Sequence, residues 1–273
     1  MNIHKRFNVL GVGVSSINMD LAKDIIGGWI ARRQSNYVTV ADVNSIMEGH
    51  ANSDFLRIHN RAGMVTPDGM PLVWFGRYSG QKDLKRVCGA DLMFALCEES
   101  QGYRHFLYGG KEGVPELLKS KLEGKFPELN VVGTYSPPFR SLTDEEDEDI
   151  IKTINAAKPD IVWVGLGAPK QEVWMAKHVD RLEAPVLIGI GAAFDFHAGL
   201  VRRAPRWVQK RGLEWLFRLL QEPRRLWRRY LKNNPLFVFL VIQQALGLRR
   251  YVDEWDTHHD IVQKSAKLAE QIN

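Results

Sequence analysis

Four short apolar runs at regular intervals constrain the fold of this chain more than any other feature. They lie at residues 104–110, 130–135, 161–167 and 185–191, and they are rich in β-branched residues. The segments between them repeat apolar residues at helical spacing. Strands that alternate with helices form right-handed βαβ units. We therefore expect an α/β fold with a mostly parallel sheet and helices on both faces, where ligands bind at the carboxyl ends of the strands.

The N-terminal part fits this scheme less regularly. Residues 7–14 and 37–42 have the composition of strands, and a helical pattern around residues 19–33 separates them. Residues 53–101 are mainly helical in pattern, with an interruption at TPDGMP. We expect this part to extend the same sheet.

The C-terminal part has a different composition. Strand patterns end near residue 200, and residues 202–232 carry eleven Lys and Arg against two acids, a charge of +9 in a chain whose total is +5. The rest of the chain is therefore slightly acidic, and the basicity is local. We expect an α/β core over residues 1–204 and a helical appendage over residues 205–273.

The appendage is predicted to contain a cationic amphipathic helix. From Arg224 onward, helical spacing places a row of bases on one side and Leu226, Trp227, Tyr230 and Leu231 on the other. Aromatic residues beside a basic face are typical of helices that lie in a membrane interface.

Three partners suit such a helix: the protein's own core, a nucleic acid and a membrane. The apolar run at residues 236–248 argues against a nucleic acid, and it is shorter than the roughly 20 residues that cross a bilayer. Anionic lipids attract basic residues by about 1 kcal/mol each. We therefore expect peripheral, monotopic attachment to an anionic membrane surface and no nucleic-acid partner. Self-association is another way to cover the apolar residues.

Other features narrow the class of protein. The N-terminus lacks the apolar core and cleavage site of a signal peptide, which predicts a cytoplasmic protein. Cys88 and Cys97 have no disulfide or metal-ligand pattern, so we expect packed thiols. The acidic run at residues 144–149 contains Asp-x-Asp, a divalent-ion motif of sugar-nucleotide enzymes. Thr143 and Glu146, however, form a capping box, which favours a helix start over a metal site.

Three glycine-bearing loops follow predicted strands, at residues 108–113, 165–172 and 189–199. Glycines such as Gly165 and Gly167 let the backbone approach a phosphate, and the next helix N-terminus supplies amide donors. None of the loops completes Gly-x-Gly-x-x-Gly, which disfavours a dinucleotide-dependent oxidoreductase. Together the loops favour a nucleotide diphosphate at the edge of the sheet.

Asp68, in TPDGMP, has two readings. An Asp between Pro and Gly commonly forms a turn. It also lies between two helical segments, where a helix start can direct a carboxylate into a cleft. There it could act as a general base that takes a proton from a hydroxyl.

The motifs VTVADVN, TPDGMPLVW, RVCGADLM, LYGGKEG, VGLGAPKQE, GIGAAFDFHAGLVRRAPRW and GLEWLFRLLQEPRR occur in this order over about residues 10–230. This set strongly resembles the WecG/TagA/CpsF family, glycosyltransferase family 26. The resemblance implies a Rossmann-like core and a C-terminal appendage that docks at the membrane and closes over the active site. It also implies metal-independent, inverting transfer of a sugar from a UDP-sugar to a polyprenyl-diphosphate-linked saccharide, with no cofactor.

The resemblance also assigns roles to individual residues. Asp68 would be the catalytic base. The donor-binding residues would be Thr39, Asp42, Arg86, Gln171 and Asp195, beside Gly165 and Gly167 of the glycine-bearing loops. The residues that meet the diphosphates would be Arg218, Arg225 and Arg228.

One position departs from the family pattern. Asp42 stands where the family commonly has Asn, and an acid near a UDP-sugar could alter sugar preference. Family members transfer N-acetylmannosamine, its uronic acid or glucose. The sequence GMPLVWFGR resembles members that act in exopolysaccharide assembly, which favours a hexose such as glucose. We expect a peripheral transferase on the cytoplasmic face of the inner membrane. The alternative is a non-enzymatic module that binds lipid or nucleic acid through its basic helix.

Overall fold

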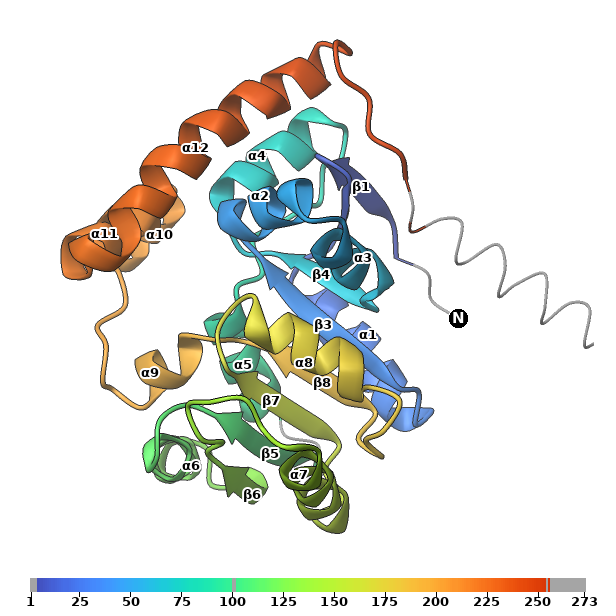
Figure 1. The fold of residues 1–273 in the computed structure, drawn as a ribbon, viewed down its shortest axis with the longest axis vertical. Coiled ribbons are helices and arrows are strands. Elements are labelled where there is room, and N and C mark those ends of the chain that lie inside the picture. Colours follow the sequence, from blue (N-terminus) through green and yellow to red (C-terminus); the bar gives the residue numbers. More distant parts are fainter. Residues whose placement is uncertain (1–3, 100–101, 254, 256–273) are drawn as a thin grey trace, which may run out of the picture.

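A six-stranded parallel sheet forms the centre of the protein in this computed structural model, which describes residues 4–99, 102–253 and 255 (Figure 1). The strand order is β4-β3-β8-β7-β5-β6, and every neighbouring pair is parallel. The strands are β3 Asn36–Ala41, β4 Met64–Pro67, β5 Arg104–Gly109, β6 Asn130–Tyr135, β7 Ile161–Gly165 and β8 Val186–Gly189. All carboxyl ends therefore meet at one edge, and the predicted fold class is confirmed.

Helices cover both faces of the sheet, and each face has its own apolar cluster. On one face lie α1 Met19–Ala31, α5 Gly89–Glu98, α6 Val114–Lys125 and α9 Ala193–His197. On the other lie α2 Val43–Ala51, α3 Ser53–Arg61, α4 Met70–Tyr78, α7 Asp144–Ala156 and α8 Lys170–His178. Because strand side chains alternate, Val38 enters the first cluster and Tyr37 the second.

The prediction of one strand over residues 7–14 is wrong. This segment is a hairpin of β1 Arg6–Val9 and β2 Val12–Ser15 in a separate antiparallel sheet. The turn is at Leu10 and Gly11, whose φ angles of 52° and 97° reverse the chain. The apolar composition of the run concealed this reversal.

Residues 53–101 are mainly helical, as predicted, but they also contain the short strand β4. Its four residues are all buried, and the strand pairs with β3 along its length. Four residues are too few for periodicity to separate a strand from a helix. The strand ends directly before Asp68.

Two smaller predictions are confirmed. Thr143 and Glu146 form a reciprocal capping box at the start of α7, where Thr143 Oγ1 accepts from the Glu146 amide and the Glu146 carboxylate accepts from the Thr143 amide. Cys88 and Cys97 are buried free thiols. The acidic run therefore begins a helix, and Asp147 within it pairs with His178 and Arg181.

The appendage, defined here as the described residues from 205 onward, is helical as predicted. It consists of α10 Arg206–Lys210, α11 Glu214–Gln221 and α12 Pro223–Ala245. The last part of the basic stretch, from residue 223, and most of the apolar run at residues 236–248 form α12, which lies across the end of the molecule beside α2 (Figure 1). No helix in the described ranges is long and apolar enough to cross a membrane. The predicted residues 256–273 lie outside the described part.

The apolar side predicted for α12 divides into two in the structure. Leu226 and Tyr230 are buried, whereas Trp227 and Leu231 are 45% and 66% exposed. Tyr230 packs edge-to-face on Trp215 of α11, at 5.8 Å between ring centroids. The helix thus packs through a narrow inward stripe and presents apolar residues outward as well.

Candidate active site at the carboxyl edge of the sheet

Asp42 and Asp68 follow neighbouring strands and lie at the same edge of the sheet. Asp42 comes directly after β3, and the Asp68 amide donates to the Ala41 carbonyl at 2.9 Å. A methyl group on Gly69 would lie only 3.9 Å from the Asp42 Cα, so the two loops are in contact. The register of β3 and β4 therefore places both carboxylates where parallel α/β sheets bind ligands.

The three glycine-bearing loops also meet at this edge, around the buried ring of Phe194. The Gly110 amide donates to the Gly165 carbonyl at 3.0 Å, which joins the first two loops. A Cβ on Gly165 would lie 2.7 Å from the Phe194 ring, which belongs to the third loop and α9. Gly167 has a φ of 76° and open space around it. The loops therefore form one surface, on which the partly exposed backbone of Gly110, Gly165 and Gly167 can approach a phosphate.

Asp68 is held by Arg86. The Arg86 Nη2 donates to Asp68 Oδ1 at 2.9 Å, and its Nε donates to the Asp68 carbonyl. Burial raises the pKa of Asp68, Arg86 opposes this rise, and the charges of Glu214 and Asp42 add to it. The side chain nevertheless remains 29% exposed. A reachable carboxyl with a raised pKa has the properties of a general base.

Arg86 connects this carboxylate to the appendage. The same Nη2 contacts Glu214 Oε2 of α11 at 2.6 Å, and Nη1 donates to Gln209 Oε1 of α10 at 3.5 Å. The carboxylates beside Arg86 raise its pKa despite burial, so it stays charged. Arg86 was assigned to the donor pocket, and the structure places it directly against the proposed base. Sequence reasoning did not assign roles to Glu214 or Gln209.

The side chains of Thr39 and Asp42 each make a hydrogen bond within the protein. Thr39 is fully buried, and its hydroxyl lies 2.9 Å from His59 Nδ1 of α3. The Asp42 carboxylate caps α2 by accepting from the Ser45 amide at 2.8 Å. Asn and Asp serve equally well as N-caps, so the departure from the family pattern keeps this function. Contact of either residue with a donor stays a prediction.

Gln171 and Glu172, at the start of α8, form a buried polar pair beside the third loop. Gln171 Nε2 donates to Glu172 Oε1 at 2.9 Å. Gln171 Oε1 and Glu172 Oε2 have no hydrogen-bond partner among the described residues. Burial raises the pKa of Glu172 to about 7. Because buried acceptors are costly when unsatisfied, a ligand with hydroxyl or amide donors would suit this pair. Glu172 was missed because the motif directed attention to its neighbour.

Asp195 and two of the predicted arginines approach the other side of the same edge. Burial raises the pKa of Asp195, Lys111 and Arg225 oppose this rise, and Glu222 adds to it. Arg225 also pairs with Glu222 at 2.6 Å. The Arg218 guanidinium lies 5.8 Å from the ring centre of Phe196, which is adjacent to Asp195 in α9. These contacts bring basic groups of the appendage to the glycine-bearing loops.

Arg228 has a different environment. Its guanidinium lies over Trp227 at 5.2 Å from the ring centre, and that ring is 45% exposed. In the described part of the chain, no hydrogen bond or ion pair joins Arg228 to the edge of the sheet. Its predicted role toward a diphosphate is untested.

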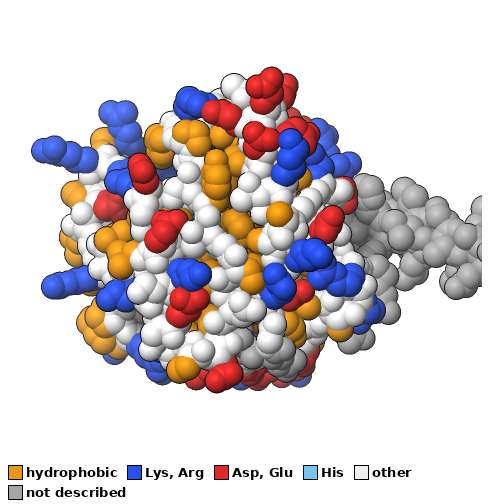
Figure 2. All heavy atoms as spheres, turned by 90° about the horizontal axis from the view of Figure 1, so that it is seen from below, with side chains coloured by type: hydrophobic (Ala, Val, Ile, Leu, Met, Phe, Trp, Pro, Cys, Tyr) orange, Lys and Arg blue, Asp and Glu red, His pale blue; other side chains and the backbone are white. Residues whose placement is uncertain are grey.

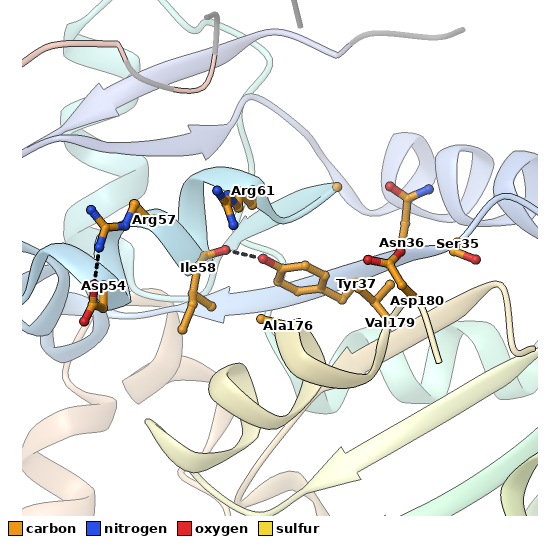
Figure 3. A pocket seen from close by; sticks show the side chains of 11 residues that line it. Ser35, Asn36, Tyr37, Asp54, Arg57, Ile58, Arg61, Ala176, Val179 and Asp180 are labelled. Carbon is orange, nitrogen blue, oxygen red and sulfur yellow. Dashed lines mark hydrogen bonds and ion pairs between the residues drawn. The ribbon is translucent and has the colours of Figure 1, made fainter. Parts of the chain in front are cut away.

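A cavity of about 420 Å³ lies elsewhere, between α3 and the end of α8 (Figure 3). Its lining includes Asn36 and Tyr37 at the start of β3 and Arg57 and Arg61 of α3, and Figure 3 shows the Arg57 side chain turned toward Asp54. The Tyr37 hydroxyl donates to the Ile58 carbonyl at 2.5 Å. Since β3 runs from Asn36 to Ala41, this cavity is at the amino end of the sheet, away from Asp68.

Comparison with known proteins places this geometry in a family. The model of the "Glycosyl transferase WecG/TagA/CpsF family" matches residues 7–251. Two relatives, from Staphylococcus aureus strains MW2 and NCTC 8325, are named N-acetylglucosaminyldiphosphoundecaprenol N-acetyl-beta-D-mannosaminyltransferase. Each is 28% identical over 260 residues, which cover 92% of this chain and 99% of the relative. The chain therefore belongs to the WecG/TagA/CpsF family of glycosyltransferases.

Proposed function

We propose that this protein transfers a hexose-type sugar from a UDP-sugar to a saccharide carried on polyprenyl diphosphate, with Asp68 as the general base. Family membership supplies the class of reaction, and the named relatives use a lipid diphosphate as acceptor. The observation that carries the proposal is the carboxyl of Asp68, partly exposed and with a raised pKa, at the same edge as three glycine-bearing loops.

The chemistry of the transfer is simple. Asp68 accepts the proton of the acceptor hydroxyl while the hydroxyl oxygen attacks the anomeric carbon. The bond from that carbon to the UDP oxygen breaks, and its electron pair leaves with the diphosphate. Attack from the side opposite the leaving group inverts the anomeric configuration. A base with a raised pKa favours this step because it is a stronger proton acceptor than an ordinary carboxylate.

Positive groups at the edge suit the departing diphosphate. The amides of the glycine-bearing loops, Lys111, Arg218 and Arg225 supply partial or full charge beside Asp195. Arginine is well matched to phosphate oxygens because its planar fork donates paired hydrogen bonds. These groups can meet the developing charge in metal-independent transfer.

The appendage has a surface suited to peripheral membrane attachment. The outward residues of α12 include exposed Val238, Phe239 and Ile242 after the basic segment. Figure 2, seen from below Figure 1, shows Lys and Arg side chains projecting on the side where α10 and α11 lie in Figure 1. Anionic lipid attracts such residues, and the apolar ones can enter the headgroup boundary. We place the enzyme on the cytoplasmic face, where UDP-sugars are available.

UDP release from a panel of UDP-sugars tests this function. The panel contains UDP-N-acetylmannosamine, its uronic acid and UDP-glucose, each with and without an N-acetylglucosaminyl polyprenyl-diphosphate acceptor in anionic vesicles. The name of the relatives puts N-acetylmannosamine first. We expect acceptor-dependent release with one donor, undiminished by EDTA. Absence of acceptor-dependent release with every donor, or its loss in EDTA, would contradict the proposal.

A further inference from the structure

We propose that Glu214 of the appendage is a positioning residue that shares Arg86 with Asp68 and thereby keeps the proposed base available for its proton. This inference rests on the proposed function of Asp68. It adds that the base is completed by a residue from outside the α/β core.

The geometry places one guanidinium between two carboxylates. The Arg86 Nη2 is 2.9 Å from Asp68 Oδ1 and 2.6 Å from Glu214 Oε2. The side chains of Arg86 and Glu214 are each only 18% exposed, so solvent screens these interactions less than it would at an open surface. The shorter bond is the one to the appendage.

Glu214 is itself held from a second side. Its Oε1 lies 3.9 Å from Arg203 Nε, and Arg203 pairs with Asp91 at 2.5 Å. The turn before α11 is fixed as well, because Gly212 has a φ of 70° and a Cβ there would lie 2.8 Å from the Trp74 ring of α4. The carboxylate is therefore anchored against the core.

Charge sharing has a direct consequence for the base. A guanidinium paired with Asp68 alone would stabilise its ionised form and make it a weaker proton acceptor. Glu214 offsets part of that charge, and it raises the pKa of Asp68. Among the described residues, Asp42 also faces Asp68 and raises its pKa. Cys88 faces Arg86, and burial raises the pKa of its thiol, which keeps it neutral.

Substitution Glu214→Gln tests this role while preserving side-chain shape. We expect kcat to fall by about tenfold, a fraction of a general base's full contribution. The acidic limb of the kcat/KM profile should move to lower pH, because removing a negative charge lowers the pKa of Asp68. The KM for the UDP-sugar should stay within about twofold of wild type, since uniform binding is unaffected. Glu214→Asp, which retains the charge, should return the acidic limb toward its wild-type position.

The control is Asp253→Asn. It removes one negative charge from the same appendage at a residue that bonds to Asn8 of the hairpin, and it should leave kcat and the pH profile unchanged. Thermal unfolding and binding to anionic vesicles are measured for each variant, so that loss of folding is recognised separately.

An unmoved acidic limb in a folded Glu214→Gln variant would overturn the inference, whether or not kcat falls. The Asp68→Asn variant separates this result from failure of the proposed function. If Asp68→Asn is inactive and the acidic limb of the Glu214→Gln profile is unmoved, only the role of Glu214 is refuted. Active Asp68→Asn removes Asp68 as the base, and the inference with it.

Discussion

The sheet edge and the appendage both contribute to the candidate site, but they are held in place differently. Main-chain hydrogen bonds fix the loops of the edge, such as those from Asp68 to Ala41 and from Gly110 to Gly165, and the strands behind them are almost entirely buried. The helix α11, by contrast, has no buried residue. It reaches the site through the side chain of Glu214. The core therefore fixes Asp68, the proposed base, and the glycine-bearing loops, whereas α11 contacts Arg86 beside them through the polar side chain of Glu214.

The two sides of α12 extend this contrast. Phe237 and Leu240 point inward and join the apolar cluster on one face of the sheet. Phe239 and Ile242 are more than half exposed. An outward face of this composition is unfavourable in water and suits a lipid surface. The helix thus serves the core on one side and, under our proposal, the membrane on the other.

The largest expected effect concerns the core. Asp68→Asn removes the proton acceptor and should lower kcat by about a thousandfold, within the usual contribution of a general base. Calorimetric titration with UDP should give near wild-type affinity, because the phosphate-facing loops are unchanged. Turnover close to wild type would show that the edge does not use this carboxylate as the base.

The inward and outward faces of α12 can be separated with two matched substitutions. Phe237→Ala should reduce the free energy of unfolding by about 3 kcal/mol or more, because it leaves a cavity in the core. Phe239→Ala should change that free energy little. It should weaken binding to anionic vesicles by about tenfold, because part of the transfer free energy of one aromatic side chain is lost. Denaturant titration and vesicle sedimentation measure the two effects. Equal changes in unfolding free energy and in vesicle binding for the two variants would contradict the distinction between the inward and outward faces.

Glu172, a buried acid in the core, should make the free energy of unfolding of the protein depend on pH. The pKa of Glu172 is raised from 4.5 to about 7, so the folded state retains a proton that the unfolded state loses. Stability contributed by the neutral carboxyl is present below pH 4.5 and is lost as pH rises through 7, by about 3 kcal/mol in total. Glu172→Gln should abolish this loss, and denaturant unfolding between pH 4.5 and 8 measures it.

Glu123→Gln is the control for that titration. Glu123 lies on α6 with its side chain 39% exposed, and its substitution should leave the dependence on pH unchanged. If wild type and Glu172→Gln lose equal stability over this range, then Glu172 is ionised in the folded protein.

The architecture was largely predictable because burial on both faces of a parallel sheet imposes continuous apolar runs, as in β7 and β8. The hairpin was not, because residues 7–14 form an apolar run in which the reversal depends only on the backbone at Leu10 and Gly11. The strand β4 escaped prediction because only Met64 and Val65 are apolar before Thr66 and Pro67, whereas β8, equally short, lies within a longer apolar run. An extended apolar run therefore predicts a strand better than the length of the strand does.

The parts of the site that lie within one loop could be predicted from their motifs. Contacts between residues far apart in the sequence were harder to predict. The positions of Asp68 and the three glycine-bearing loops at one edge follow from parallel strands. The contact between Arg86 and Glu214, 128 positions apart, depends on how α11 docks. One signal was available, since Glu214 is one of only two acids in the basic stretch at residues 202–232. An acid retained among so many bases calls for a specific cationic partner.

The smallest effect expected tests whether α12 is bonded to the core beside the site. Asn233 Nδ2 donates to Asn44 Oδ1 at 3.2 Å, and Asn44 Nδ2 donates to Asp42 at 3.2 Å. Asn233→Ala should destabilise the protein by about 1 kcal/mol, because it leaves the nearly buried Asn44 without that donor. A double-mutant cycle with Asn44→Ala should return a coupling of about 0.5 kcal/mol or more, since the two residues are in contact. Simple additivity would mean that this bond does not contribute to the docking of α12 on the core.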